Sequence, residues 1–302
     1  MDVYLPIAEM SVNLAVMLGL GTIVGFLSGM FGVGGGFVMT PLLIFFGIPP
    51  AIAVGSQGPQ ILASSFSSML GHLRRGTLDL RMGAVLAAGG LVGSAAGILI
   101  FRLLRELGQI DAAIALGYVL FLSTVGLLML VESLRAIAGR RRGVRRARAR
   151  RHYWLHRLPL RMRFPTSRLY ISALTPLAIG FLGGLLAAIF GIGGGFVLIP
   201  AMIYLIGMPT SVVIGTSHFQ IAFVAVLTTL LHAYANRTVD IVLAILVIAG
   251  GVVGAQYGTR AATRLPAEQV RVLFALMLLA VCGKLVYDLI LPPADRYSLA
   301  SF

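Results

Sequence analysis

Polar side chains occur at corresponding places in the two halves of this apolar sequence. The set consists of Ser56, Gln57, Gln60, Thr216, Ser217, His218 and Gln220. Polar groups at membrane depth are costly unless they lie inside the protein or face a cavity. Amides and hydroxyls can donate hydrogen bonds to an oxyanion without holding it by full charge. The set therefore predicts a binding site for a small anion, and hydrogen bonding between helices is the alternative.

A glycine-rich segment precedes each polar set. The two segments are Gly34-Gly35-Gly36 and Gly193-Gly194-Gly195, and Phe and then Pro follow each of them at the same spacing. Glycine inside a helix costs about 1 kcal/mol relative to alanine, so each segment predicts a helix break. The free backbone N–H groups at the start of the next helix attract anions. We therefore add these six glycines to the predicted site, with close helix packing as the alternative.

One ionisable residue, His218, lies well inside a predicted span. Imidazole changes charge near physiological pH, so His218 could hold an anion or couple transport to protons. A structural histidine is the alternative. We predict no catalytic residue, no metal site and no cofactor, because the sequence has no coupled set of Cys, His and carboxylate residues and no nucleophile–base pair at depth. An enzyme is therefore not expected.

The composition is that of a membrane protein with many spans. Of the 302 residues, 58% are hydrophobic and 11% are charged, whereas soluble domains carry about 25% charged residues. Apolar runs of about 20 residues recur, which is the length that a helix needs to cross a bilayer. The sequence therefore predicts an all-α polytopic integral membrane protein.

The same order of elements is predicted twice. In the first membrane repeat, residues 1–134, a glycine-broken re-entrant hairpin precedes three transmembrane helices at about 50–73, 80–104 and 111–134. In the second repeat, residues 170–302, a matching hairpin precedes helices at about 210–235, 240–264 and 267–291. Asp79 and Asp240 begin corresponding helices, where N-capping explains both. Since each half would cross the membrane an odd number of times, the two repeats are expected to have inverted topology.

A basic linker, residues 135–169, separates the repeats. It contains thirteen arginines and no acidic residue, and it supplies most of the net charge of +14. Loops rich in Arg and Lys stay in the cytoplasm, so we expect a cytoplasmic linker and periplasmic termini. Attraction to anionic lipids explains the charge better than nucleic-acid binding does.

The doubled glycine motif resembles the TauE/SafE family of sulfite exporters, also known as DUF81-type membrane proteins. The segments Ala53-Val54-Gly55-Ser56 and Ile214-Gly215-Thr216-Ser217 fit this resemblance, as do His72 and His232. The resemblance implies a carrier of the bacterial inner membrane for sulfur-containing anions such as sulfite or sulfoacetate. The two halves differ at Gln57-Gly58-Pro59-Gln60 and Ser217-His218-Phe219-Gln220, and the resemblance does not fix the cargo.

We therefore expect a secondary transporter that exports a small sulfur-containing or other anion by alternating access, through rocking of its two halves. The expected partners are the anion, the lipid bilayer and anionic lipids at the linker, with no nucleic acid; a homodimer remains open. A proton- or sodium-coupled importer of the same anion class and an anion channel are the alternatives.

Overall fold

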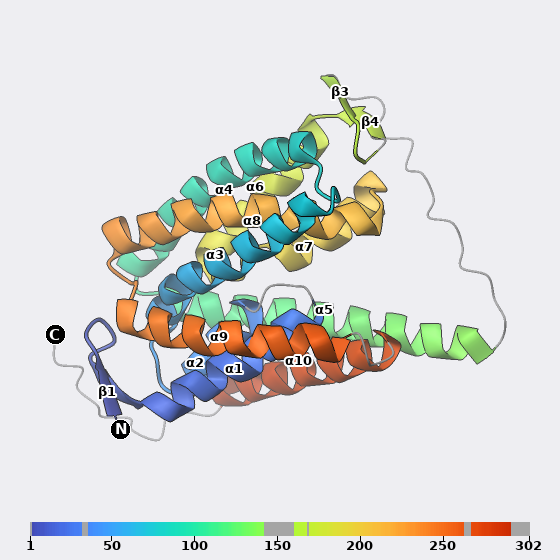
Figure 1. Ribbon diagram of the computed structural model, residues 1–302. Helices are drawn as coiled ribbons and strands as arrows, with labels where there is room; N and C mark the ends of the chain where they lie inside the picture. The colour runs from blue at the N-terminus through green and yellow to red at the C-terminus, as the bar shows by residue number, and fades with distance from the viewer. Residues whose placement is uncertain (1, 32–35, 142–159, 168, 263–266, 291–302) are drawn as a thin grey trace.

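The computed structural model describes residues 2–31, 36–141, 160–167, 169–262 and 267–290 (Figure 1). Its helices confirm the predicted class of an all-α membrane protein with many spans. In these ranges, four helical segments are long and apolar enough to cross a membrane: Leu80–Glu106, Ile110–Val131, Val212–Asn236 and Ile241–Gly258. Shorter apolar helices cover Leu14–Leu27, Leu174–Phe190 and Val197–Ile206.

The order of elements in the first half recurs in the second half. The first half contains β1 (Asp2–Leu5), β2 (Met10–Asn13), α1 (Leu14–Phe31), α2 (Gly36–Phe45), α3 (Pro50–Arg74), α4 (Leu80–Glu106) and α5 (Ile110–Arg141). The second half contains β3 (Arg161–Phe164), β4 (Leu169–Ser172), α6 (Leu174–Phe190), α7 (Gly195–Pro200), the π-helix η2 (Ala201–Ile206), α8 (Thr210–Leu231), the π-helix η3 (His232–Asn236), α9 (Ile241–Ala262) and α10 (Ala267–Ile290).

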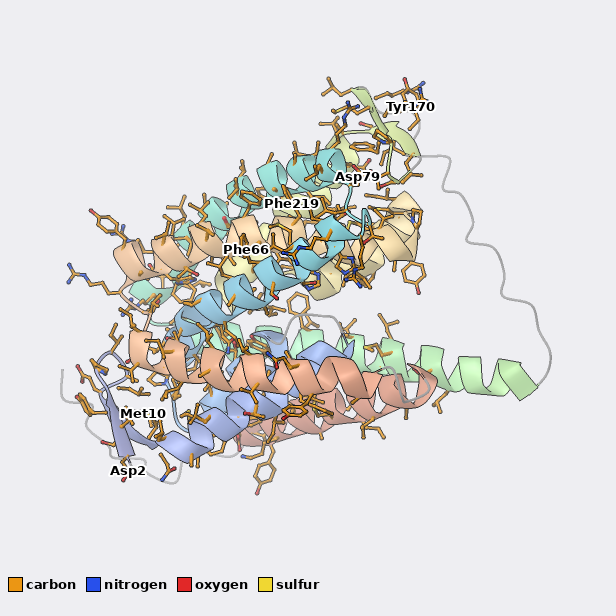
Figure 2. The ribbon with its side chains drawn as sticks, viewed as in Figure 1. Asp2, Met10, Phe66, Asp79, Tyr170 and Phe219 are labelled. Carbon is orange, nitrogen blue, oxygen red and sulfur yellow. The ribbon has the colours of Figure 1, made fainter. Side chains whose placement is uncertain are left out.

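Each half begins with a short antiparallel hairpin that the sequence analysis missed. Next to the turns, Leu5 pairs with Met10 in the first hairpin, and Phe164 pairs with Leu169 in the second. The two hairpins lie at opposite ends of the helices (Figures 1 and 2). Strand β3 and the last turns of α5 fall within residues 135–169, which the sequence analysis assigned to the linker, and β4 begins at the last residue of that range.

Two helix pairs each join one half of the chain to the other. α1 packs along α9, and α4 packs along α6 (Figure 1). A Cβ added to Gly93 of α4 would overlap the carbonyl oxygen of Phe181 in α6, and one added to Gly254 of α9 would overlap that of Thr22 in α1. Small residues let helix backbones approach this closely in lipid, where packing drives association. The halves are therefore intertwined and do not form two separate bundles.

Buried apolar side chains form two cores. One core lies mostly among α1, α2, α5, α9 and α10, and the other mostly among α4, α6, α7, α8 and the second hairpin. They correspond to the lower and upper groups of helices in Figure 1. α3 contributes to both cores, with Val54 in the first and Ile61 in the second. Each of the two units thus contains helices from both halves, and α3 packs against α8 between them.

A buried aspartate at the start of α4 ties the second hairpin to the helices. Asp79 is 1% exposed, and its Oδ1 accepts a hydrogen bond from the Met82 N–H at 3.1 Å, which makes it the predicted N-cap. Its Oδ2 accepts from the N–H and the hydroxyl of Ser167 at 3.0 and 2.6 Å. The N–H of Asp79 donates to Oγ1 of Thr216 at 3.1 Å. The carboxylate and the backbone N–H of Asp79 thus join α4, α8 and the hairpin.

Asp240 does the same at the start of α9. Its Oδ1 accepts from the Leu243 N–H at 3.1 Å, and its Oδ2 accepts from the Ile7 N–H in the first hairpin at 2.9 Å. Its own N–H donates to Oγ of Ser56 at 2.9 Å. In both places an aspartate of one half therefore anchors the hairpin of the other half.

Replacing Gly93 with alanine is expected to lower the thermal unfolding temperature of the purified protein in detergent. The added methyl group would overlap the Phe181 carbonyl oxygen, and overpacking of this kind costs about 2 kcal/mol. Gly283→Ala in α10 is the control, because nothing lies within 4 Å of the added Cβ and alanine favours a helix over glycine. Equal unfolding temperatures for the two variants would contradict the close packing of α4 on α6.

Candidate functional site

Gly36, the described residue of the first predicted glycine segment, lies near the second break and α3. Gly36, the first residue of α2, lies against the end of α6: a Cβ added to Gly36 would be 2.9 Å from the carbonyl oxygen of Gly191. The same Cβ would be 2.6 Å from Cδ1 of Ile61, and a Cβ added to Gly193 would be 3.0 Å from Cγ2 of Ile61. The side chain of Ile61 therefore lies between the two breaks.

The second break consists of three glycines in left-handed backbone conformations. The φ angles of Gly191, Gly193 and Gly194 are +65°, +74° and +71°, which residues with a Cβ rarely adopt. α6 ends at Gly191, whose N–H donates to the Ala187 carbonyl oxygen at 2.9 Å. The helix is thus interrupted where the sequence predicted, and glycine is needed there for its conformation.

The carbonyl groups that the break leaves free at the end of α6 have partners. The hydroxyl of Tyr118 in α5 donates to the Phe190 carbonyl oxygen at 2.6 Å. Nε2 of His232 lies 2.9 Å from the Ala188 carbonyl oxygen. Broken helix ends inside a membrane need such partners, because water does not reach them there.

The other predicted glycines have different positions. Gly34 and Gly35 lie outside the described residues. Gly194 packs on α6, where an added Cβ would be 2.6 Å from the Gly183 carbonyl oxygen. Gly195 begins α7, which continues into η2 without a gap.

The three predicted glutamines are buried, and each has at least one amide atom without a hydrogen-bond partner among the described residues. Gln57, Gln60 and Gln220 are 0%, 6% and 0% exposed. Both polar atoms of Gln57, both of Gln220 and Oε1 of Gln60 have no partner in the part of the chain that the structure describes. A buried polar group without a partner costs about 1–3 kcal/mol. These amides are therefore available to a ligand or to water.

Gln60 and Gln220 occupy equivalent places in the two halves. A Cβ added to Gly251 of α9 would be 3.1 Å from Nε2 of Gln60, and one added to Gly90 of α4 would be 2.5 Å from Nε2 of Gln220. Glycine at both positions thus leaves room for an amide. The sequence analysis placed Gln60 and Gln220 at corresponding positions of the two halves. In the structure each of the two amides packs against a glycine.

The remaining predicted polar residues already have partners in the protein. Ser56 and Thr216 accept hydrogen bonds from the backbone of Asp240 and Asp79, as described above. The hydroxyl of Ser217 donates to the Ile214 carbonyl oxygen at 2.9 Å, and Nδ1 of His218 lies 2.7 Å from that same oxygen. Their hydrogen-bonding capacity is thus partly used within the protein.

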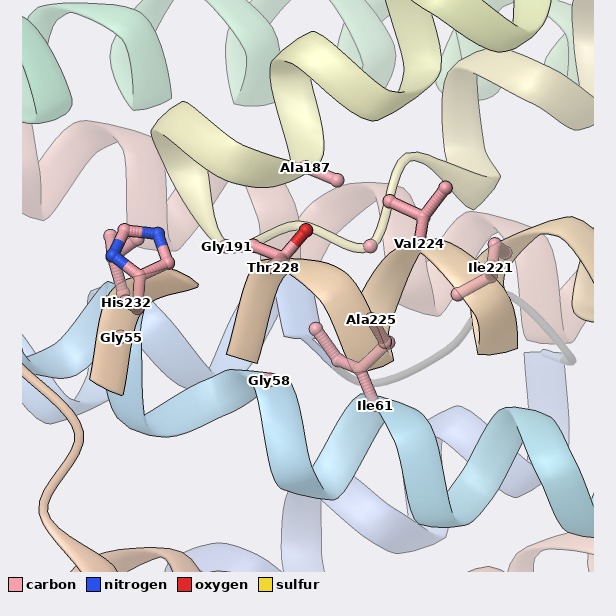
Figure 3. A pocket seen from close by; sticks show the side chains of 12 residues that line it. Gly55, Gly58, Ile61, Ala187, Gly191, Ile221, Val224, Ala225, Thr228 and His232 are labelled. Carbon is pink, nitrogen blue, oxygen red and sulfur yellow. The ribbon is translucent and has the colours of Figure 1, made fainter. Parts of the chain in front are cut away.

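A narrow cavity lies between α3, α8 and the second break (Figure 3). Its volume is about 10 Å³, which is room for about one water molecule. Its lining consists of Val54, Gly55, Gly58, Ile61, Ala187, Gly191, Gly193, Ile221, Val224, Ala225, Thr228 and His232. Gly193 is a predicted site residue, whereas Thr228 was missed, because a single hydroxyl in an apolar helix gives no signal by itself.

His232 closes one end of the cavity. Its side chain is 1% exposed, and its Nδ1 lies 3.1 Å from Nδ2 of Asn236, while Nε2 faces Ala188. A neutral ring that donates from Nε2 and accepts at Nδ1 satisfies both contacts. The corresponding residue in the first half, His72, contacts Oγ1 of Thr77 at 2.8 Å and is only half-buried. His232 and His72, at corresponding places in the two halves, therefore differ in their burial.

Residues 17–285 match the family described as Sulfite exporter TauE/SafE. The chain belongs to the TauE/SafE family. This TauE/SafE protein is therefore a membrane transporter. Its family is a family of membrane transporters and not of enzymes. The resemblance inferred from the glycine motif is confirmed.

Relatives of the TauE/SafE protein cover almost its whole length. It is 34% identical to a "Probable membrane transporter protein" of Xylella fastidiosa (strain 9a5c), over 89% of this chain and 93% of that protein. It is 30% identical to the "Probable membrane transporter protein YjnA" of Bacillus subtilis (strain 168), over 92% of this chain and all of that protein. A shorter stretch, 35% of this chain, is 31% identical to "Sulfite exporter TauE/SafE family protein 1" of Arabidopsis thaliana, of which it covers 24%. No solved structure matches the chain.

Replacing Gln220 with leucine is expected to raise the unfolding temperature of the purified protein in detergent. Leucine has a similar volume and removes two buried polar atoms that have no partner in the described residues. Thr216→Val is the control, because it removes the acceptor of the Asp79 N–H and should lower the unfolding temperature. If Gln220→Leu instead destabilises the protein as Thr216→Val does, the glutamine has a structural role.

Proposed function

We propose that this transporter exports a small sulfur-containing anion, or another small anion, across the bacterial inner membrane by alternating access. The observation that carries the proposal is the burial of Gln57, Gln60 and Gln220 in α3 and α8, with amide atoms that have no partner among the described residues. Amides can replace the water around an oxyanion, and in the unbound protein they stay unsatisfied.

The lack of strong charge in the cavity lining supports an anion that is bound and then released. Among the lining residues only His232 is ionisable, and both its ring nitrogens face partners. An inside-negative membrane potential of 100 mV supplies about 2.3 kcal/mol for each negative charge that leaves the cell. Export of an anion therefore needs no coupled ion.

The unequal packing of the two ends supports alternating access. At the end of the first hairpin, His232, Asn236 and Thr238 are buried, whereas His72 and Thr77 at the other end are half-buried. A carrier built from equivalent halves has one end closed and the other loosened in each of its states. Because α1 is packed on α9 and α4 on α6, the moving parts in this proposal are the two mixed units and not the two halves of the sequence.

The proposed orientation places the second hairpin and the arginine-rich linker in the cytoplasm, next to anionic lipids. The first hairpin, which carries Asp2 and Glu9, and the end of α10 then face the periplasm. Interaction with lipids follows from this orientation, and the end at which His72 and Thr77 are half-buried is then the cytoplasmic one.

Sulfite efflux from proteoliposomes tests the proposal. An inside-negative potential, set by a potassium gradient with valinomycin, should accelerate efflux, and Gln220→Leu should stop it. Efflux that ignores the potential would contradict export driven by the potential. Uptake driven by an imposed pH gradient and lost in His218→Gln would favour the proton-coupled importer, and failure to show counterflow of labelled sulfite would favour a channel.

Cysteine labelling tests the state and the orientation. In a Cys282→Ser background, Thr77→Cys should react with a membrane-impermeant maleimide in inverted vesicles, because Thr77 is half-buried. Thr238→Cys, at the corresponding place in the second half, should resist labelling from the opposite face, because Thr238 is 1% exposed. Equal labelling of both positions would contradict the closed end.

A further inference from the structure

Two side chains near the end of α4 contact the π-helix η3. Phe101 packs edge-on against the ring of His232, with the ring centroids 4.8 Å apart and an angle of 84° between the ring planes. One turn further along α4, Nη1 of Arg105 donates a hydrogen bond to the Asn236 carbonyl oxygen. Because residues four apart lie on one face of a helix, a single face of α4 makes both contacts. We call these two contacts the α4–η3 clasp.

The clasp connects the two units of the structure. Phe101 is 0% exposed and packs in the core that lies mostly among α1, α2, α5, α9 and α10. His232 directly follows α8, which contributes to the other core. Asp111 in the first turn of α5 interacts electrostatically with Arg105, so this cation has partners on α5 and on η3. Separation of the units at this end would break these contacts.

The clasp lies at the end of the helices where η3 is deeply buried. His232, Asn236 and Thr238 are 1%, 4% and 1% exposed. The N–H of Thr238 donates to the His232 carbonyl oxygen at 3.2 Å. A Cβ added to Gly55 of α3 would be 2.5 Å from Oγ1 of Thr238. The segment from His232 to Thr238 is therefore held between α3 and the end of α4.

The corresponding positions of the second half lack the residues of the clasp. In place of Phe101 and Arg105, the sequence there has Ala262 and Pro266. Neither alanine nor proline has an aromatic ring or a cationic donor. His72, at the end that these positions would serve, is only half-buried. The unequal burial of the two ends thus has a cause in the sequence of α4.

We propose that the α4–η3 clasp is a latch that holds this end of the transporter closed and favours the state in which the other end is open. The inference rests on the proposed function, because a latch has a role only in a protein that alternates between two states. An interaction made in one state adds to the free-energy difference between the states, so its loss shifts their populations. Both contacts of the latch must break each time this end opens.

Labelling rates of single cysteines test the latch in the purified full chain, with a fluorescent maleimide and a Cys282→Ser background. With Phe101→Leu and Arg105→Gln combined, Thr238→Cys should react about tenfold faster than without them. One aromatic contact and one charge-assisted hydrogen bond are lost, which predicts a change of this size. Thr77→Cys at the other end should react more slowly in the same double variant, because one end closes as the other opens.

Single variants and a matched control separate the latch from a general loss of packing. Arg105 is exposed, so water competes for its bond, and Arg105→Gln alone should have a smaller effect than Phe101→Leu. This surface variant keeps the test valid if Phe101→Leu does not fold. Arg102→Gln is the control, because Arg102 lies on the same turn of α4 and pairs with Glu106 on the surface at 2.9 Å. It should leave both labelling rates unchanged.

The outcomes separate the latch from the proposed function. Faster labelling of Thr238→Cys with an unchanged rate for Thr77→Cys would show local opening only, and the latch would be wrong. Unchanged rates at both positions would also overturn it, and the proposed function would stand if the wild type exports sulfite. If both rates change as expected but the wild type transports neither sulfite, sulfate nor thiosulfate, the latch stands and the proposed cargo is wrong.

Discussion

Close backbone contact between helices of opposite halves is the constraint on which the rest of this structure depends. α1 lies on α9 and α4 lies on α6, so neither half encloses a core by itself. Glycines at these contacts leave no space for side chains, and the backbones therefore set the distance between helices. The same spacing places Gln60 against Gly251 and Gln220 against Gly90. The contacts that join the two halves thus also hold two amides at depth in the protein.

Hydrogen bonding separates the structural polar residues from the candidate binding residues. Asp79 and Asp240 are fully buried, and each carboxylate accepts bonds from a helix start and from a hairpin. Gln57, Gln220 and Thr228 are also buried, but they have polar atoms without a partner among the described residues. Since each unsatisfied group costs about 1–3 kcal/mol, packing alone does not account for them. A bound ligand or water would supply the missing hydrogen bonds, which is the physical reason to assign these residues to a site.

Much of the membrane architecture could be predicted, because glycine, proline and apolar length act locally. The break at Gly193 follows from backbone freedom, and the burial of Gln60 and Gln220 follows from their place in apolar helices. The hairpins could not be predicted, because four-residue strands give too short a pattern, although Pro6 and Pro165 stand at equivalent places in their turns. The free hydroxyl of Thr228 was also hidden, since its surroundings come from a loop and a helix far away in the sequence.

The position of the cavity connects binding with movement. Its walls come from α3 and from α8 with the second break, and these elements lie where the two units meet. A bound anion would contact both units, so separation of the units would remove part of its ligands. Attraction to a full charge falls slowly with distance in a low-dielectric interior, whereas a hydrogen bond is largely lost when it lengthens by about 1 Å. A site made of neutral hydrogen-bonding groups would therefore let a small displacement of the units release an anion that was held firmly before.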